Sequence, residues 1–352
     1  LIILCCKVGK MKKILILGAG AMGSAFTVPC VENSHDVILA GTHLEDNTID
    51  QIIQNDYLHP TLNCKLPKNL KIIKFNNFSK EFKNKPDLIV IAVSSKGIDW
   101  AAKEILKYYS KDISILLLTK GLTIIDNKFS TLSDKISLIF EKKGFSNLSI
   151  SAIKGPCLAT GLINKIRTSA VVANKDISKS QWIGKLISTN YYTLEFSEDI
   201  VGVEICGAIK NLYSMIIGAS KGLSSETADD EIKSKYHYNT AASLIHRSIS
   251  EMVFFTKFFK GKEETVYGLA GIGDLYVSAI GGRNSKMGKY LGDGYNYLEA
   301  KKKFMINDTV EGAELAFEIG SKIMKEFSKN DLPLMINLLD SIINNKKFKI
   351  NW

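Results

Sequence analysis

Arginine is scarce in this sequence. Of the 46 basic residues only three are arginine, and the lysines are dispersed along the chain rather than gathered into a basic block. Proteins that bind nucleic acids usually concentrate their basic residues and interleave aromatic side chains among them. We therefore expect no nucleic-acid partner in spite of the formal net charge of +10. A positive field of this kind would attract a phosphorylated substrate.

Cysteine spacings typical of metal or redox sites are also absent. The six cysteines form no C-x-x-C pair and show no spacing with histidine of the kind that holds zinc. We therefore expect no metal site, and reduced thiols in a cytoplasmic protein. The cysteines are Cys5, Cys6, Cys30, Cys64, Cys157 and Cys206.

The sequence lacks an apolar run that approaches the length of about 18–20 residues needed to span a bilayer, so we expect no membrane insertion. The opening LIILCCK is short and has no basic leader, which does not fit a signal peptide. Because Met11 directly precedes the first strand pattern, we interpret residues 1–10 as an upstream extension.

From Lys12 onwards, short apolar runs alternate with helical stretches. Runs that are apolar throughout indicate strands covered on both faces, and the order βαβα predicts a parallel, doubly wound sheet of the Rossmann type. The runs lie at 13–18, 36–41, 70–75, 87–93, 113–119 and 148–153, and helical stretches at 21–33, 43–55, 98–109 and 128–142 separate several of them.

The second half of the chain has a different texture. Long helical patterns cover 200–223, 240–259, 310–327 and 332–345, with no convincing strand among them. A length of 352 residues fits two domains, since one domain has about 100–200. We therefore predict an α/β fold with a Rossmann-type dinucleotide-binding domain over 11–197 and an all-α substrate domain over 198–352.

The motif GAGAMG at 18–23 follows the first predicted strand and opens the first predicted helix. In such a loop the first glycine permits a tight turn, the second lets backbone approach a pyrophosphate, and the third lets the helix pack close to the strand. The free N–H groups at the start of the helix attract phosphate. We therefore predict that Gly18, Gly20, Ala21, Met22 and Gly23 bind a dinucleotide.

The end of the second strand should distinguish NAD from NADP. A carboxylate there would bind the ribose 2′-hydroxyl of NAD, but the chain continues with AGTH over 40–43, and Glu45 and Asp46 come only later. This pattern leans towards NADP, with Thr42 as a contact. No arginine stands there for a 2′-phosphate either, so both nucleotides remain open.

Two lysines occupy positions that suit ligands. Lys120 follows the run 113–119, at the carboxyl end of a strand, where open α/β sheets bind ligands. Lys210 lies in the apolar stretch GVEICGAIKNLYSMIIGA, and a lysine removed from water can serve as a general acid or base near neutral pH. The turn GPCLATG at 155–161 follows a further strand and offers backbone N–H groups.

The densest glycine segment, 268–288, contains Asp274, Ser278, Arg283 and Asn284. Arg283 is one of the three arginines in a chain that otherwise uses lysine. A planar guanidinium can bind a phosphate through two parallel hydrogen bonds, which lysine cannot do. This segment therefore predicts a phosphate-binding site.

Taken together, these motifs resemble the NAD(P)-dependent glycerol-3-phosphate dehydrogenases, which interconvert dihydroxyacetone phosphate and sn-glycerol 3-phosphate. GAGAMGSA, TKGL, GPCLATG, VEICGAIKN, GLAGIGDL, GGRN and VEG occur in that family's order, from about Met11 to the C-terminus. The resemblance implies a cytoplasmic homodimer that uses NAD(P)H and no metal. Its product would supply glycerophospholipid synthesis.

The resemblance also implies roles for single residues. Lys210 matches the catalytic lysine that gives a proton to the carbonyl oxygen, Asp274 the aspartate that orients this lysine, and Lys120 a lysine near the reaction centre. The substrate would be bound by Lys120, Gly155, Asp274, Ser278, Arg283 and Asn284, the last two at its phosphate. Beyond the glycine loop, the cofactor would be bound by Thr42, Lys120, Ala159, Arg283 and Glu311.

The chain departs from the family pattern at three places. Cys157 replaces a usual serine, Gly161 a usual glutamate, and Ala40 a common tryptophan. A thiol is a poor hydrogen-bond donor, which argues against a side-chain contact from Cys157 to the substrate.

Two other functions stay open at this point. Ketopantoate reductases and β-hydroxyacid dehydrogenases share the two-domain plan but do not need Asp274 together with the Arg283–Asn284 pair. A non-catalytic dinucleotide-sensing module would need neither Lys120 nor Lys210.

Overall fold

The computed structural model describes residues 10–350. Their internal contacts form two compact units. Unit 1 comprises the described chain up to Lys120 together with Thr131–Ile200, and unit 2 comprises Gly121–Ser130 and the described chain from Val201 onwards. The expected upstream extension, apart from Lys10, lies outside the described residues, as do Cys5 and Cys6.

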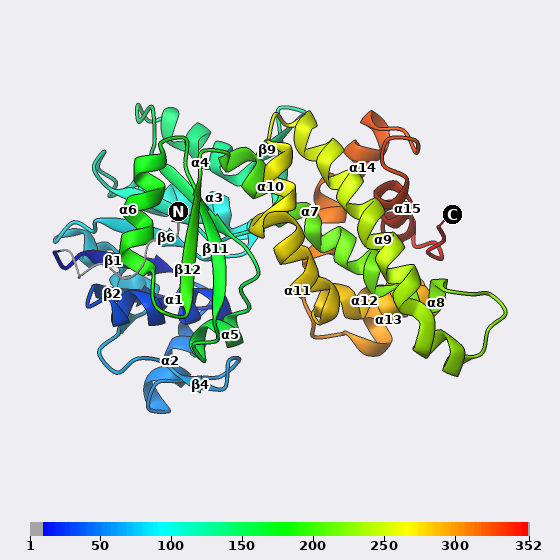
Figure 1. Cartoon of the computed structure of the whole chain (residues 1–352). Coiled ribbons are helices and arrows are strands. Elements are labelled where there is room, and N and C mark those ends of the chain that lie inside the picture. The colour runs from blue at the N-terminus through cyan, green and yellow to red at the C-terminus, as the bar shows by residue number, and fades with distance from the viewer. Residues whose placement is uncertain (1–9, 351–352) are drawn as a thin grey trace. The chain divides into compact units, whose positions relative to one another are not determined.

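Unit 1 is built around an eight-stranded sheet, in which β12 and β11 form one side (Figure 1). The order is β12-β11-β10-β7-β6-β1-β2-β5, and neighbouring strands are parallel except for β10 and β11. The predicted α/β class with a mainly parallel, doubly wound sheet is confirmed. The strands are β1 (Lys13–Leu17), β2 (Asp36–Ala40), β5 (Lys71–Ile73), β6 (Leu88–Ile91), β7 (Ser114–Leu117), β10 (Ile150–Lys154), β11 (Thr168–Ala173) and β12 (Tyr192–Ser197).

The apolar runs did not reveal β11 and β12. Strand β12 is at the edge of the sheet, and only Tyr192 and Leu194 of YTLEFS are buried, so it contains no continuous apolar run. Strand β11 begins with Thr168 and Ser169 and becomes fully buried only after them. Both strands contain polar residues because one end or one edge of each strand is exposed to solvent.

Helices cover both faces of the sheet. In β1, Ile14 and Ile16 belong to one apolar core with α1 and α6, whereas Leu15 and Leu17 belong to another with α3 and α4. Successive strand side chains point to opposite faces, so both faces must be apolar when both are covered. The helices of unit 1 are α1 (Ala21–Glu32), α2 (Asp46–Gln54), α3 (Ile98–Leu106), α4 (Leu132–Glu141), α5 (Ala159–Ile163) and α6 (Ile177–Ile187).

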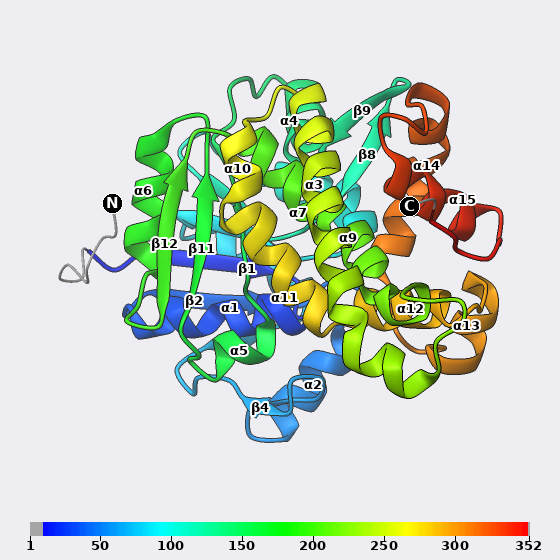
Figure 2. The ribbon, with the colours of Figure 1, turned by 45° about the vertical axis from the view of Figure 1, so that its right-hand side comes forward.

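A small hairpin of β8 (Leu122–Ile125) and β9 (Lys128–Thr131) interrupts unit 1, and most of it belongs to unit 2. Thr123 donates a hydrogen bond to Glu318 of α14 at 2.8 Å, and Figure 2 shows β8 beside that helix. The expected helix over 128–142 is therefore wrong in its first four residues. It starts at Leu132 because the Thr131 side chain accepts the Asp134 N–H at 3.1 Å and caps the helix.

The described part of unit 2 is helical apart from the hairpin. Its central helix is α7, and the long α9 begins where Asp229 caps it through the Ile232 N–H at 2.8 Å. The helices are α7 (Ile200–Gly218), α8 (Ser220–Leu223), α9 (Asp230–Phe258), α10 (Glu263–Tyr267), α11 (Asp274–Ile280), α12 (Arg283–Gly292), α13 (Tyr297–Phe304), α14 (Glu311–Glu326) and α15 (Pro333–Ile343).

Helix α7 corrects one expectation. By length and composition Ile200–Gly218 could cross a membrane, although no apolar run of that size was expected from the sequence. However, 94% of its most apolar window is buried inside the protein. Its apolar side chains therefore pack inside the protein, as those of a core helix do.

Candidate active site

The dinucleotide-loop candidate joins β1 to α1. Gly18 has φ of +115°, and a Cβ there would lie 2.7 Å from the Ala92 carbonyl oxygen. A Cβ on Gly23 would lie 2.1 Å from the Gly18 carbonyl oxygen. Only glycine fits either position. Ala21 and Met22 form the first turn of α1, so their N–H groups point out of the helix start.

Two side chains from other elements hold the peptide groups of this loop. The His59 ring accepts the Thr61 and Leu62 N–H groups at Nδ1, both at 3.2 Å, so its Nε2 carries a proton and donates to the Ala19 carbonyl at 3.0 Å. On the other side of the loop, the Glu45 Oε2 accepts the Ala19 N–H at 3.1 Å.

The position of Glu45 changes the interpretation of the second strand. The sequence placed no carboxylate at the end of β2, but the turn after it folds back, with the Glu45 N–H bonded to the Thr42 carbonyl at 3.0 Å. The Glu45 Oε2 then accepts the Thr42 N–H at 2.8 Å. A carboxylate therefore lies at the end of β2, although it comes five residues after the last residue of that strand.

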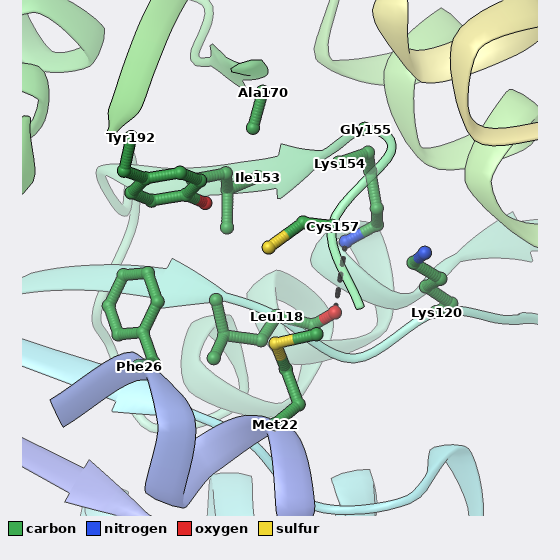
Figure 3. A pocket seen from close by; sticks show the side chains of 10 residues that line it. All are labelled: Met22, Phe26, Leu118, Lys120, Ile153, Lys154, Gly155, Cys157, Ala170 and Tyr192. Carbon is green, nitrogen blue, oxygen red and sulfur yellow. Dashed lines mark hydrogen bonds between the residues drawn. The ribbon is translucent and has the colours of Figure 1, made fainter. Parts of the chain in front are cut away.

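A pocket in unit 1 brings several predicted residues together. Met22, Lys120 and Gly155 line it, and the half-buried Cys157 does so as well (Figure 3). Ala159 begins α5 two residues beyond Cys157. Tyr192 also lines the pocket, and burial raises the pKa of its phenol well above the ordinary value, which keeps it neutral.

Lys154 is a pocket residue that the sequence analysis missed. It is only 2% exposed, and its ammonium donates to three successive backbone carbonyls at the end of β7: Leu117 at 3.2 Å, Leu118 at 3.4 Å and Thr119 at 3.0 Å. Figure 3 shows the bond to Leu118. These bonds fix the turn that carries Lys120. One feature of the sequence could have revealed Lys154: it is a charged residue at the end of an otherwise apolar run, directly before Gly155-Pro156.

Replacing Lys154 by methionine should lower the free energy of unfolding by about 2–4 kcal/mol, because three inward-facing carbonyls lose a charged donor. Urea denaturation of the purified protein measures this loss. The matched control is Lys175→Met, which changes an exposed lysine just after β11 and should have little effect. Equal stability of the two variants would contradict the role given to the Lys154 ammonium.

In unit 2, α7 and α11 form a buried ion pair. Lys210 donates to the Asp274 Oδ1 at 2.8 Å and to the Ser278 hydroxyl, and the two charged side chains are only 7% and 4% exposed. Asp274 and Ser278 are four residues apart in α11, so both face the same side of that helix. A buried charge is costly unless it is paired and hydrogen-bonded. The three residues therefore form one polar cluster inside an apolar unit.

The glycine-dense segment before α11 positions Asp274 beside Lys210. Leu269–Gly273 forms a π-helical turn, in which the Gly273 N–H bonds to the Gly268 carbonyl at 3.2 Å. A Cβ on Gly271 would lie 2.0 Å from the Val266 carbonyl oxygen, so the backbone could not pack this closely with another residue. Such turns are rare and often occur at functional sites.

A second network joins α12 to α14. The Arg283 Nε donates to the Thr309 carbonyl and its Nη2 to the Glu311 Oε1, both at 2.6 Å. Asn284 donates to the Asn211 Oδ1 at 3.0 Å and to the Glu311 Oε2 at 3.2 Å. Asn211 follows Lys210 in α7, so this network and the ion pair share a helix. Arg283 stays half-exposed, with its remaining N–H groups available to an anion.

Known protein families match the two parts of the chain separately. The models of the NAD-dependent glycerol-3-phosphate dehydrogenase N-terminus and C-terminus match residues 13–180 and 199–350. An NADP(+)-dependent glycerol-3-phosphate dehydrogenase of Archaeoglobus fulgidus is 33% identical over 315 residues, which cover 88% of this chain and 90% of the relative. The chain belongs to the NAD-dependent glycerol-3-phosphate dehydrogenase family. It is therefore an oxidoreductase that uses a nicotinamide dinucleotide.

Other glycerol-3-phosphate dehydrogenases also match this chain over most of its length. A glycerol-3-phosphate dehydrogenase [NAD(P)+] of Mesoplasma florum is 29% identical over 333 residues, 93% of each chain. Among solved structures, glycerol-3-phosphate dehydrogenase of Coxiella burnetii matches with a TM-score of 0.80 at 23% identity and covers 96% of both chains. This likeness supports the fold of a Rossmann-type unit followed by a helical unit.

Proposed function

We propose that this family member reduces dihydroxyacetone phosphate to sn-glycerol 3-phosphate and catalyses the reverse oxidation, by hydride exchange with NAD(P)H. The observation that carries the proposal is the buried Lys210–Asp274 ion pair in the same unit as the Arg283–Asn284 pair. Reduction of a phosphorylated ketone needs a general acid at the carbonyl and a cation at the phosphate. The product is suited to glycerophospholipid synthesis.

Lys210 is the proposed general acid. Its ammonium gives a proton to the carbonyl oxygen during reduction and stabilises the negative charge that develops there. Asp274 compensates the lysine charge in the interior and fixes its direction, and the Ser278 hydroxyl holds the same ammonium from the next turn of α11. In the oxidation direction the neutral lysine accepts the hydroxyl proton.

The residues of unit 1 fit a dinucleotide. A Cβ on Gly20 would meet only the Glu45 Oε1, at 3.9 Å, so backbone there is open to a pyrophosphate. When bound, the nicotinamide supplies or takes up the hydride. Thr42 at the end of β2 and Met22, Lys120 and Gly155 in the pocket are the proposed contacts of unit 1.

Replacing Arg283 by lysine should raise the KM for dihydroxyacetone phosphate by about 10–100-fold, the value of one hydrogen bond between charged groups. Arg283 can hold Thr309 and Glu311 and still offer N–H groups to a phosphate, whereas lysine has too few donors at fixed angles. Steady-state kinetics with the phosphorylated ketone and with unphosphorylated dihydroxyacetone measure the effect. The increase in KM should appear only with the phosphorylated ketone.

Lys286→Ala is the matched control for this experiment. Lys286 is an exposed cation on the same helix, α12, and pairs with Asp308 at 3.3 Å. If it changed the KM as much as Arg283→Lys does, general electrostatic attraction rather than a phosphate contact would explain the result.

The direct test of the proposed function is the initial rate with dihydroxyacetone phosphate, measured with NADH and NADPH in parallel. Turnover of ketopantoate but not of dihydroxyacetone phosphate would replace this assignment with that of the related reductases. Binding of a dinucleotide without any turnover would indicate a sensing module.

We also propose that the protein acts as a cytoplasmic homodimer, without a nucleic-acid partner. The support is the family's usual assembly and the burial of α7. Light scattering after size exclusion should give twice the chain mass of 39.0 kDa. A monomer at micromolar concentration would contradict the dimer.

A further inference from the structure

The Glu45 carboxylate is held at the meeting point of the glycine loop and the end of β2. Its two hydrogen bonds, from Ala19 N–H at 3.1 Å and Thr42 N–H at 2.8 Å, both go to Oε2. The Oε1 points towards Gly20, since an added Cβ there would lie 3.9 Å from it. The bond from His59 to the Ala19 carbonyl fixes the next peptide group of the loop. The carboxylate is therefore preorganised beside the loop.

In a doubly wound sheet this is the place of the adenosine ribose of a bound dinucleotide. A carboxylate oxygen there can accept a hydrogen bond from the 2′-hydroxyl of NADH. A 2′-phosphate offers no comparable donor and carries nearly two negative charges. Two like charges in close contact near a protein surface repel each other more strongly than they would in bulk water. The geometry of Glu45 thus favours the hydroxyl over the phosphate.

A cation that offsets this repulsion would have to lie beside β2 or in the turn after it. Lys74 follows β5, the neighbour of β2, but it is paired with Asp50 at 2.7 Å. The one arginine of unit 1, Arg167, directly precedes β11, which lies five strands from β2 in the sheet. His43 packs against Trp100, with ring centroids 4.6 Å apart and ring planes tilted by 57°. Unit 1 therefore has no arginine beside Glu45 to bind a 2′-phosphate.

We propose that Glu45 is the residue that selects the nucleotide, and that it makes this chain prefer NADH to NADPH. This inference rests on the proposed function only in that the glycine loop binds the dinucleotide. It reverses the leaning towards NADP that the sequence AGTH suggested. The reversal comes from the turn that brings Glu45 back to β2, which the linear sequence does not show.

The test is equilibrium binding without substrate. The purified full chain is titrated with NADH and NADPH by nicotinamide fluorescence, and with ADP-ribose and its 2′-phosphate by calorimetry. We expect NADH to bind about 10²-fold more tightly than NADPH, corresponding to about 3 kcal/mol. The two ADP-ribose ligands should differ in the same sense, since they lack the nicotinamide and report on the adenosine end alone.

Glu45→Gln removes the charge and keeps an oxygen that can accept from the loop. It should reduce the preference by about 10-fold or more, through weaker NADH binding and tighter NADPH binding. Asp46→Asn is the matched control because it removes the same charge from the adjacent, exposed residue. The control should leave the ratio of the two dissociation constants within about 2-fold, in the range of a screened surface charge.

Two outcomes would overturn the proposal. One is a wild-type protein that binds NADPH as tightly as NADH or more tightly, a measurement that needs no variant to fold. The other is a ratio that Glu45→Gln and Asp46→Asn change equally. Either result with normal turnover of dihydroxyacetone phosphate would leave the proposed function intact. Binding without turnover would contradict that function while leaving the role of Glu45 in place.

Discussion

Replacing Lys210 by alanine is expected to lower kcat for dihydroxyacetone phosphate by about 10²–10⁴-fold, the usual contribution of a positioned general acid. The reason is that no other ammonium is fixed by both Asp274 and Ser278 in the described part of the chain. The dissociation constant of the nucleotide should change little, since Lys210 is not among the proposed nucleotide contacts. Stopped-flow measurement of nucleotide oxidation separates the chemical step from product release.

Two further measurements distinguish an acid from a structural residue. The alanine variant leaves a space where the lysine side chain was, so added ethylamine should restore part of the rate, with the restored rate following the concentration of ethylammonium. Lys289→Ala, which changes an exposed lysine on α12, is the matched control and should keep normal turnover. Unchanged kcat in Lys210→Ala would falsify the mechanism proposed above.

The largest effect on stability is expected at Glu251, a carboxylate of α9 that is only 5% exposed. Its two oxygens accept the Leu334 N–H at 2.7 Å and the Met335 N–H at 2.9 Å, which belong to the first turn of α15. The Tyr213 hydroxyl of α7 donates to the same carboxylate at 3.2 Å. Glu251 thus caps one helix and connects it to two others.

Glu251→Ala should lower the free energy of unfolding by about 3–5 kcal/mol at pH 5, because two backbone N–H groups and a buried phenol lose their acceptor. Denaturation by urea, followed by circular dichroism, measures the loss. The matched control is Glu226→Ala, which removes an exposed carboxylate before α9 and should cost far less. Similar losses in the two variants would show that Glu251 is not a structural junction.

This contribution should depend on pH. Burial raises the pKa of Glu251 from 4.5 to about 7, against the opposing hydrogen bonds of Leu334, Met335 and Tyr213. Since the folded chain then holds this proton more tightly than the unfolded chain, the contribution is complete below pH 4.5 and is lost as pH rises through about 7. The expected loss is about 3 kcal/mol. The difference between wild type and Glu251→Ala should shrink over this interval, and a constant difference would contradict the raised pKa.

The elements that the sequence predicted well are those whose signal is local. Apolar runs such as 113–119 became β7, and the helical patterns at 310–327 and 332–345 became α14 and α15 with small changes at their ends. A covered strand or an amphipathic helix is marked by its own residues, so a short window is enough. The partly polar strands β11 and β12 and the hairpin over 122–131 lacked such a signal and were missed.

The sequence alone determined the α/β class, the dinucleotide motif GAGAMG and the family, because these depend on local periodicity and on motifs in a given order. Only the tertiary structure decided that Glu45 returns to the end of β2, that Lys154 holds the turn before Lys120, and that Glu251 caps α15. Each of these contacts joins backbone groups to a charged side chain from another element or turn. Their physical basis is the need to pair buried polar groups, and the partner is set by packing in three dimensions rather than by spacing along the chain.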